Sequence, residues 1–337
     1  MNDTFLKACR KEPTDHIPVW FMRQAGRSLP GYRALRQKYG VLELTQTPEL
    51  AAQVSMEPIE RLGVDAAILF ADIMLLPIAM GVKVEIIDAI GPVIEDPITE
   101  DNLARLAPLE DTNIAYLGET IRLLRQKLEV PVIGFAGAPF TLASYLIEGK
   151  PTRNWTLTKR FMREQPDAWH RLMTILSDGI VQYLSFQVNA GAQAVQLFDS
   201  WVGCLSPADY RTYVLPHVQR IFSELKTTNV PRIHFATNTA GFLEDFSNVD
   251  AEVIGVDWRI GLREAKARIG DKAIQGNLDP HVLLASQEEI EKSIDAMIDP
   301  LDTTTGYIFN LGHGILPETD DKKVRKVVEY VHGKGTR

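Results

Sequence analysis

The feature that most constrains the fold is a repeated unit, in which a short apolar run ends in polar or glycine residues and a helical stretch follows. Eight such runs occur along the 337 residues: IPVWFM (17–22), AAILFAD (66–72), VPVIGFAG (130–137), QAVQLFDS (193–200), RIHFAT (232–237), VIGVDW (253–258), KAIQGNLD (272–279) and GYIFNLGH (306–313). Nearly continuous apolar strands alternating with helices indicate a parallel sheet covered on both faces. Eight of them predict an α/β fold of the closed (β/α)8 TIM barrel type.

Cap and turn residues place the helices between these runs. Thr47 and Pro48 open a helix that runs to Arg61, and Gly63 ends it. Pro139 opens another after the third run. Further helices are predicted over residues 112–128, 166–189, 206–226 and 320–331.

The segment from 73 to 130 is too long for a single crossover between two strands. It contains VKVEII (82–87) and PVI (92–94) on either side of a polar turn that includes Gly91, so we expect an extra β-hairpin inserted after the second strand. Such an insertion explains a chain longer than the roughly 250 residues typical of this barrel. We find no linker, low-complexity segment or tandem repeat, and a single domain over residues 1–337 is predicted.

Composition excludes several classes of protein. The net charge of −8 argues against general nucleic-acid binding, which needs a basic face. No apolar run is long enough to span a membrane, and the first twenty residues lack the apolar core of a signal peptide. Cys9 and Cys204 lie far apart, without a Cys/His cluster, which excludes a disulfide framework and argues against a zinc site. We expect a cytoplasmic protein that binds neither nucleic acid nor membrane.

The run PVWFMRQAGR (18–27) concentrates positive charge in an acidic chain. Arg23 and Arg27 follow an apolar strand, and Gly26 lets the backbone turn between them. Arg33 and Arg36 come within a further turn or two. Guanidinium groups bind carboxylate and phosphate in a planar, bidentate manner, so the pattern predicts an anionic ligand held near these residues.

In a barrel of this type the chemistry lies where the carboxyl ends of the strands meet. The polar or small residues at these ends are Arg23, Arg27, Asp72, Gly137, Asp199, Ser200, Trp258, Asn277, Asp279 and His313. Asp72 follows the apolar residues AILFA, so its carboxylate emerges from a buried strand to face the arginines. A helix cap or a loop ion pair is the alternative role for it.

Two histidines and one tyrosine carry further expectations. His313 lies between two glycines in LGHGILP, where the glycines serve either a phosphate cradle or a tight turn before Pro317. His234 lies inside RIHFAT and is expected to be a core or supporting residue. In GFAGAPFTLASYLIEG (134–149), most of the apolar helical face is packing, and the Tyr145 hydroxyl is the polar tip that can face the cavity.

Two of these segments, PVWFMRQAGR and GFAGAPFTLASYLIEG, resemble the characteristic motifs of the uroporphyrinogen decarboxylase family. FADIMLLPIAMG, QLFDSWVG and NLGHGILP match its other strand-end segments in order, so the resemblance covers essentially the whole chain. The chain departs from the usual pattern at Ser28 and Gly31, where the family often has tyrosine and glutamate, and at Trp201, where some members have histidine. The resemblance implies a cofactor-free, metal-free (β/α)8 barrel that forms a homodimer and converts uroporphyrinogen III to coproporphyrinogen III in heme and other tetrapyrrole synthesis.

The resemblance also implies roles for individual residues. Arg23, Arg27 and Arg36 would pair with substrate carboxylates. Asp72 would accept the pyrrole N–H groups and stabilise the cation that forms during decarboxylation. The remaining implied contacts with substrate are Tyr145 and Ser200, as hydrogen-bond donors to carboxylates, Phe198, as a wall of the pocket, and His313. The proton donor is Arg23, His313 or water, and guanidinium is a poor acid unless strongly perturbed.

Two other functions were weighed. Zinc-dependent methyltransferases of the corrinoid and methionine-forming type share the barrel but need a His-x-Cys pair and a distant cysteine. Here the corresponding segment is His234-Phe235-Ala236, with alanine where the thiolate should be. A porphyrin carrier on the same scaffold would need the arginines but not Asp72, whose presence favours catalysis.

Overall fold

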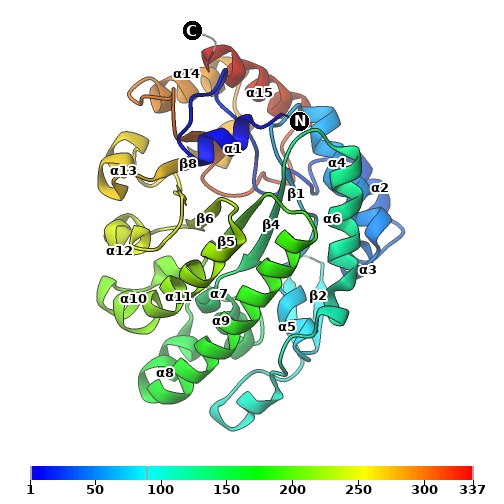
Figure 1. Cartoon of the computed structure of the whole chain (residues 1–337), viewed down its shortest axis with the longest axis vertical. Helices are drawn as coiled ribbons and strands as arrows, with labels where there is room; N and C mark the ends of the chain where they lie inside the picture. The colour runs from blue at the N-terminus through cyan, green and yellow to red at the C-terminus, as the bar shows by residue number, and fades with distance from the viewer. Residues whose placement is uncertain (1, 89, 336–337) are drawn as a thin grey trace.

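The computed structural model describes residues 2–88 and 90–335. Its main element is a seven-stranded parallel sheet, and the helices form a ring around it (Figure 1). In spatial order the strands are β1 (Ala67–Ile68), β4 (Val132–Gly137), β5 (Ala194–Asp199), β6 (Arg232–Ala236), β7 (Val253–Gly255), β8 (Ala273–Leu278) and β9 (Tyr307–Leu311). Chain order and spatial order agree, as expected when each strand is followed by a helix that returns the chain to the same edge.

The first predicted strand, 17–22, is wrong as a strand. It forms a single parallel bridge, between Val19 and Phe309 of β9. Phe309 N–H donates to the Pro18 carbonyl at 2.9 Å, and on the other side Asp65 N–H donates to the Val19 carbonyl at 2.8 Å. The segment therefore lies between β9 and the residues that lead into β1.

Side chains take up the backbone donors that a regular ladder would use. Val19 N–H donates to the Asp65 carboxylate at 2.8 Å, and Met22 N–H donates to the Asn310 side-chain carbonyl at 3.2 Å. Pro18 has no N–H at all. The apolar pattern of the segment does not indicate these hydrogen bonds to side chains, and they explain why the strand prediction failed.

Most predicted helices are confirmed with close bounds. They are α4 (Pro48–Leu62), α6 (Ala115–Lys127), α7 (Pro139–Glu148), α9 (Pro166–Asn189) and α15 (Asp321–Gly335). Gly63 ends α4 with a φ of 74°, a left-handed conformation that glycine adopts without strain. The remaining helices are α1 (Thr4–Cys9), α2 (Pro30–Arg36), α3 (Val41–Gln46), α5 (Leu75–Ala79), α8 (Thr156–Glu164), α12 (Leu243–Ser247), α13 (Leu262–Ile269) and α14 (Gln287–Ile298).

The helix predicted over 206–226 is divided into α10 (Pro207–Tyr213) and α11 (Leu215–Leu225). Pro216 has no N–H, and its ring restricts the residues before it, so the chain bends at Val214 (φ −125°, ψ −53°). Short 3₁₀ turns connect the longer elements: η1 (Glu100–Arg105), η2 (Asp111–Ile114), η3 (Val202–Cys204), η4 (Lys226–Thr228), η5 (Ala240–Phe242) and η6 (Pro280–Leu284).

The segment between β1 and α6 contains the two further strands that the sequence predicts. β2 (Val84–Ile87) pairs antiparallel with β3 (Gly91–Ile94), with Val84 opposite Ile94. They form a sheet of their own, separate from the parallel one. That this pair is an insertion into a standard barrel stays a prediction.

The buried apolar residues form two groups, one on each face of the parallel sheet. In β5, Ala194 belongs to the inner group, and Val195 and Leu197 belong to the outer group, which packs against the helices. This alternation follows from the period of two in a strand. Inside the sheet the Trp20 indole donates to the Gln275 side chain at 2.9 Å, and Gln275 donates to Gln196 at 3.0 Å, so polar groups there bond to each other across the interior.

Asp65, just before β1, connects both ends of the described chain. Besides Val19 N–H, its carboxylate accepts hydrogen bonds from His16 at 2.9 Å, His332 at 2.8 Å and Asn2 at 3.2 Å. His16, Asp65 and His332 are the group of possible metal ligands that residues 2–88 and 90–335 bring together. Both carboxylate oxygens already accept protein donors, so the group acts as a hydrogen-bonded clamp.

None of the helices within the described residues is both long and apolar enough to cross a bilayer.

Candidate active site

Arg23 follows residues 17–22 and has an unusual backbone. Its φ is +60°, in the left-handed region that costs a residue with a side chain about 1 kcal/mol or more. The buried Gln24 holds this turn, because its side chain accepts from Phe21 N–H at 2.9 Å and donates to the Ala66 carbonyl at 2.9 Å. Gln24 thus ties the arginine motif to the residues beside β1 and offsets the strain.

The two glycines of LGHGILP permit close packing. Gly314 lies against the aliphatic stem of Arg23, and Gly312 lies against Trp258, so a side chain at either position would collide with its neighbour. Ile315 N–H donates to the Met22 carbonyl at 2.9 Å and fixes this segment beside the arginine motif. The glycines therefore permit close approach to the side chains of Arg23 and Trp258, a role that the sequence did not indicate.

Asp72 lies beyond β1, near Arg23 as expected, and it also bonds to the backbone that leads into α5. Its Oδ1 accepts the Met74 N–H at 2.8 Å, and its carbonyl accepts the Leu75 N–H at 3.1 Å, which starts α5. Burial raises the pKa of Asp72, although the Met74 N–H and the nearby Arg23 act to lower it. The carboxylate is thus held by one oxygen, in surroundings that disfavour its charge.

Tyr145, from α7, lies beside Asp72 and Arg23. Burial, and next the Asp72 charge, raise the pKa of Tyr145 to about 12, while Arg23 opposes them. The Tyr145 ring stacks on Trp201 with centroids 3.9 Å apart and planes at 30°. Tyr183, from α9, is also near Asp72, whose charge adds to the effect of burial in raising the pKa of Tyr183. Asp72 is therefore close enough to one guanidinium and two phenols to interact with them electrostatically.

The Arg23 side chain is exposed to water, yet many protein atoms surround it. Burial and the neighbouring Arg27 lower the pKa of Arg23, and Tyr145 and Asp72 act in the opposite direction. A crowded but hydrated guanidinium is the arrangement expected of a group that waits for an anion. The exposed Arg27 lies next to it.

His313 lies on the other side of Arg23. Burial, then Arg23, lower the pKa of His313 to about 4, Arg259 adds to the lowering and Asp257 opposes it. The imidazole is therefore neutral near pH 7, where it can donate or accept a hydrogen bond but carries no charge.

Arg36 is engaged elsewhere. Its Nη2 donates to Asp88 at 2.6 Å, next to β2, and its Nη1 donates to the Tyr39 carbonyl at 2.6 Å. Tyr32 links the two regions: burial raises its pKa, and Arg36 and Arg27 both lower it. The structure thus places Arg36 at the outer end of the arginine motif, with Arg27 between it and Arg23.

Helix α2, which carries Arg36, is held by Glu57 of α4. The Glu57 carboxylate accepts the N–H groups of Gly31 at 2.8 Å and Tyr32 at 3.0 Å. A Cβ at position 31 would lie 2.6 Å from a Glu57 oxygen. The departure from the family pattern at Gly31 therefore has a local cause, because glycine makes room for this carboxylate.

Phe198 and Ser200 lie at the end of β5. The Phe198 ring makes edge contacts with Phe135 and Phe235, at centroid distances of 5.4 and 5.8 Å. The Ser200 carbonyl accepts the Thr237 hydroxyl at 2.8 Å. The next residue, Trp201, stacks its ring on Tyr145.

Asp199, between them, is buried on the opposite face of the strand. Its carboxylate accepts the Thr141 hydroxyl at 2.8 Å, and burial raises its pKa to about 7. Thr141 Oγ1 in turn accepts the Trp201 N–H at 3.3 Å. Asp199 therefore supports the backbone under the Trp201 and Tyr145 stack and is not part of the open edge of the sheet.

Three other strand-end residues also serve the fold. Asn277 is buried and donates to the carbonyls of Asp257 and Ile260, both at 2.7 Å. Asp279 accepts from His281 at 2.9 Å in an exposed pair. A Cβ at Gly137 would lie 2.8 Å from the Leu142 side chain, so glycine there permits close packing.

His234 is a core residue, as expected. It is buried, stacks on Phe246 with ring centroids 3.9 Å apart, and burial lowers its pKa to about 3. It is not a member of the group of possible metal ligands found among the described residues.

Sequence reasoning missed several contributors to this region. Gln24 lies within the arginine motif, and its polar character between two arginines was the available signal. Trp201 was marked only as a departure from the family pattern. Tyr183, Asp257 and Arg259 had no such mark, because the fold brings them near Asp72 and His313.

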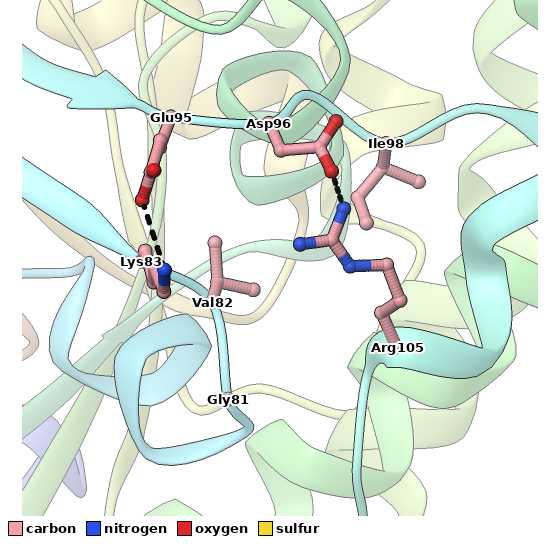
Figure 2. A pocket seen from close by; sticks show the side chains of 7 residues that line it. All are labelled: Gly81, Val82, Lys83, Glu95, Asp96, Ile98 and Arg105. Carbon is pink, nitrogen blue, oxygen red and sulfur yellow. Dashed lines mark ion pairs between the residues drawn. The ribbon is translucent and has the colours of Figure 1, made fainter.

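Two cavities in the described part of the chain are lined by other residues than Arg23, Asp72, Tyr145 and His313. One, of about 270 Å³, is lined by Gly81, Val82, Lys83, Glu95, Asp96, Ile98 and Arg105. Figure 2 shows that ion pairs of Lys83 with Glu95 and of Arg105 with Asp96 flank it. The other, of about 290 Å³, lies beside Gly31 and Arg61. The charged groups of the first cavity are already paired, and neither cavity is lined by Arg23 or Asp72, so we place the functional site at the Arg23 and Asp72 cluster.

Comparison with known structures shows the fold. A methyltransferase from Methanosarcina mazei aligns with a TM-score of 0.82 at 20% identity, covering 99% of this chain and 98% of that one. A B12-independent methionine synthase from Shewanella sp. W3-18-1 aligns with a TM-score of 0.57 at 11% identity, covering 88% of each chain. At such low identity the likeness concerns the barrel-like architecture alone.

Sequence comparison is far closer. Residues 1–334 match the family described as Uroporphyrinogen decarboxylase (URO-D). Proteins named uroporphyrinogen decarboxylase from Bacillus subtilis (strain 168) and Geobacillus sp. (strain WCH70) are each 50% identical over 98% of this chain, and cover 95% and 97% of their own lengths. With the arginine motif, Asp72, Tyr145 and His313 gathered in one region, the chain belongs to the uroporphyrinogen decarboxylase family.

Proposed function

We propose that this protein removes the four acetate carboxyl groups of uroporphyrinogen III as CO2 and yields coproporphyrinogen III, a step of heme and other tetrapyrrole synthesis. The activity is supported by membership of the family and by a relative that is 50% identical over 98% of this chain. The observation that carries it to particular residues is the surroundings of Asp72, a carboxylate of raised pKa beside Arg23 and Tyr145.

The substrate accounts for this combination of charges. Uroporphyrinogen has eight carboxylates on its rim and four pyrrole N–H donors at its centre. Arg23 and Arg27 would clamp rim carboxylates, each charge-assisted hydrogen bond contributing about 1.5 to 3 kcal/mol. The free oxygen of Asp72 would accept the pyrrole N–H groups, while Met74 N–H keeps the other oxygen in place.

The reaction needs a temporary positive charge on the ring. Protonation of a ring carbon beside the acetate-bearing carbon turns that pyrrole into a cationic electron sink. The C–C bond to the carboxylate then breaks, its electron pair enters the ring, and CO2 leaves. A proton added to the resulting methylene forms the methyl group, and loss of the first proton restores the aromatic ring. The fixed negative charge of Asp72 stabilises the cation in a site that disfavours isolated charge.

The proton donor remains a choice between Arg23 and His313. His313 has a pKa of about 4 in the free protein, so near pH 7 it carries no proton beyond its neutral form. Burial and Arg27 lower the pKa of Arg23, which moves it toward acidity. We therefore assign His313 to hydrogen bonding of a substrate carboxylate and retain Arg23 as the candidate donor.

The supporting residues follow from their positions. Tyr145, fixed by its stack on Trp201, would donate its hydroxyl to a carboxylate near the reacting ring. Ser200 would donate in the same way, and Phe198 would line the pocket from β5. Arg36 would exchange Asp88 for a substrate carboxylate.

We further propose the finer features expected from sequence. Residues 17–22 act as the eighth member of a closed (β/α)8 barrel, with β2 and β3 as an inserted hairpin, and residues 1–337 form one domain. The protein works in the cytoplasm as a homodimer, without a cofactor and without binding nucleic acid or membrane. The bonds of Pro18 and Val19 to both sides of the gap in the sheet support the closure.

The test is anaerobic incubation of purified protein with uroporphyrinogen III. We expect CO2 release and accumulation of a product with four carboxylates, separated by chromatography after oxidation. A protein that folds and binds the substrate without releasing CO2 would contradict the proposal and favour the carrier alternative. Metal analysis of the same preparation checks the methyltransferase alternative, which requires bound zinc.

A further inference from the structure

Arg259, just beyond β7, is a cation that the mechanism above does not use. Its side chain is 43% exposed, and its Nη1 donates to the Asp257 carboxylate, which is only 2% exposed. Asp257 also accepts the backbone N–H groups of Arg259 at 3.2 Å and Asn238 at 2.9 Å. The carboxylate is thus fixed by the backbone and in turn fixes one side of the guanidinium.

The Trp258 ring supports the other face of this guanidinium. The Arg259 Cζ lies 4.2 Å from the ring centroid, a cation–π arrangement. Trp258 packs closely on the segment after β9, because its backbone N and ring would lie 2.6 and 2.7 Å from a Cβ on Gly312. Arg259 is therefore held before any ligand arrives, so binding loses little side-chain freedom.

His313 locates Arg259 relative to the active site. Gly312, on one side of His313, meets Trp258, and Gly314, on the other side, meets Arg23. Both Arg23 and Arg259 lower the pKa of this one imidazole. His313 therefore lies between two guanidinium groups, one from the arginine motif and one from the end of β7.

The donors of Arg259 are only partly used. Within residues 2–88 and 90–335, the hydrogen bonds of its guanidinium are confined to Nη1, which leaves the hydrogens of Nε and Nη2 for a ligand. Its alternative role, as a neutralising partner for Asp257, needs no exposed face and no orienting ring.

We propose that Arg259 binds a carboxylate of the substrate on the far side of His313 from Arg23, and that this carboxylate is a propionate that does not react. The inference rests on the proposed function, because a rim of eight carboxylates is what requires cations on both sides of the site. Arg259 is a binding residue, so its removal weakens affinity and leaves the chemical step intact.

The experiment compares Arg259→Met with the wild type and with Arg263→Met. Arg263 is an exposed arginine four residues further along, on α13, so its removal makes the same change in net charge. We expect KM for uroporphyrinogen III to rise about three- to tenfold in Arg259→Met, with kcat within about twofold of wild type, and no change in Arg263→Met. Arg259→Lys should recover part of the affinity, since lysine keeps the charge and loses the planar fork.

A second measurement separates this inference from the proposed function. Oxidised uroporphyrin has the same eight carboxylates and is not turned over, so quenching of tryptophan fluorescence gives its Kd directly. A Kd that rises in Arg259→Met but not in Arg263→Met supports the inference whether or not the wild type decarboxylates. Equal Kd values for wild type and Arg259→Met overturn it. A loss of kcat with unchanged KM and a lowered melting temperature also overturns it, because the role of Arg259 would then be structural. Wild-type protein that binds uroporphyrin but releases no CO2 contradicts the proposed function alone.

Discussion

The aliphatic stem of Arg23 occupies the space that a side chain on Gly314 would need. A Cβ on Gly314 would lie 2.4 Å from Arg23 Cδ, 2.6 Å from Cγ and 3.0 Å from Cβ. All three are near the backbone of Arg23, which is itself held at a φ of +60°. Gly314 therefore makes room for the Arg23 side chain, and the segment that follows β9 helps to position it.

Gly314→Ala should displace Arg23 and reduce activity. The backbone at Gly314 does not have a positive φ, so alanine fits there and the contact with Arg23 alone decides the outcome. We expect kcat/KM to fall about tenfold or more and stability to fall by about 1 to 3 kcal/mol, measured by anaerobic kinetics and denaturant unfolding.

Gly333→Ala is the matched control for that variant. A Cβ on Gly333, in α15, would meet no atom within 4 Å. Alanine there should raise the free energy of unfolding by about 0.5 to 1 kcal/mol and leave kinetics unchanged. Normal kinetics in Gly314→Ala would show that Arg23 can be positioned in another way.

Asp72→Asn should lower turnover by about two to three orders of magnitude without destabilising the fold. Asparagine keeps the oxygen that accepts the Met74 N–H but carries no charge. Because burial raises the pKa of Asp72, the ionised carboxylate costs the folded state free energy once the pH exceeds the unfolded pKa, increasingly until the folded pKa is passed. The variant should lack this cost and melt at the same or a higher temperature at neutral pH.

Asp279→Asn serves as the control, because Asp279 follows β8 at the same edge of the sheet and pairs with His281 in solvent. It should retain turnover. A large loss there, or near-normal turnover in Asp72→Asn, would contradict the role assigned to Asp72.

His313→Asn should reduce kcat/KM without changing the shape of its pH profile between about pH 6 and 8. The pKa of His313 is lowered to about 4, so the free enzyme has a neutral imidazole throughout this range. Loss of a hydrogen bond from a neutral imidazole lowers kcat/KM by the same factor at each pH. A limb near pH 6 to 7 that is present in the wild type and absent in the variant would instead identify His313 as a titrating acid.

The Asp65 clamp should make stability depend on acid. Burial alone would raise the pKa of Asp65, but hydrogen bonds from His16, His332 and Val19 N–H outweigh it and lower the pKa to about 2. A depressed carboxylate pKa gives stability that is present above the unfolded pKa of 3.8 and is lost as the pH falls toward 2. That difference corresponds to about 2 kcal/mol.

His16 should act in the opposite direction. The Asp65 hydrogen bond raises its pKa above 6.5, so its contribution is complete below pH 6.5 and is lost as the pH rises through the raised value. Denaturant unfolding of wild type and Asp65→Asn at pH 3, 5 and 7 measures both effects. Parallel pH dependences for the two proteins would show that Asp65 does not supply this stability.

Local signals predicted most of the fold. The bounds of α9, Pro166–Asn189, agree with the predicted range because proline at the start and Gly191 after the end act within a few residues. The segment 17–22 was wrong as a strand because three of its N–H donors bond to side chains, those of Asp65, Gln24 and Asn310, while Trp20 N–H bonds to the Phe309 carbonyl. Asn310 lies almost 300 positions away. Pairing of this kind leaves no trace in a short window.

The candidate site was predicted only where local sequence signals marked its residues. Arg23, Asp72 and His313 end apolar runs, and strand ends converge in a parallel barrel, so their proximity followed from the fold. Asp199 ends a run too, but it lies one residue from Phe198 and so points to the other face of β5. The relation of Arg259 to the site could not be predicted from sequence, because it depends on the close packing of Trp258 on Gly312 in the fold.

The fastening of residues 17–22 by side chains has a consequence for how this protein can change over time. A strand in a regular ladder is locked to its neighbours in steps of two residues, and a slip inverts every side chain. In residues 17–22, individual N–H groups are instead bonded by separate side chains, those of Asp65, Gln24 and Asn310. Substitution of one of these side chains can shift the direction of Arg23 by a small amount while the seven-stranded sheet stays intact. The direction of the Arg23 guanidinium can therefore change gradually in evolution, without rebuilding the scaffold.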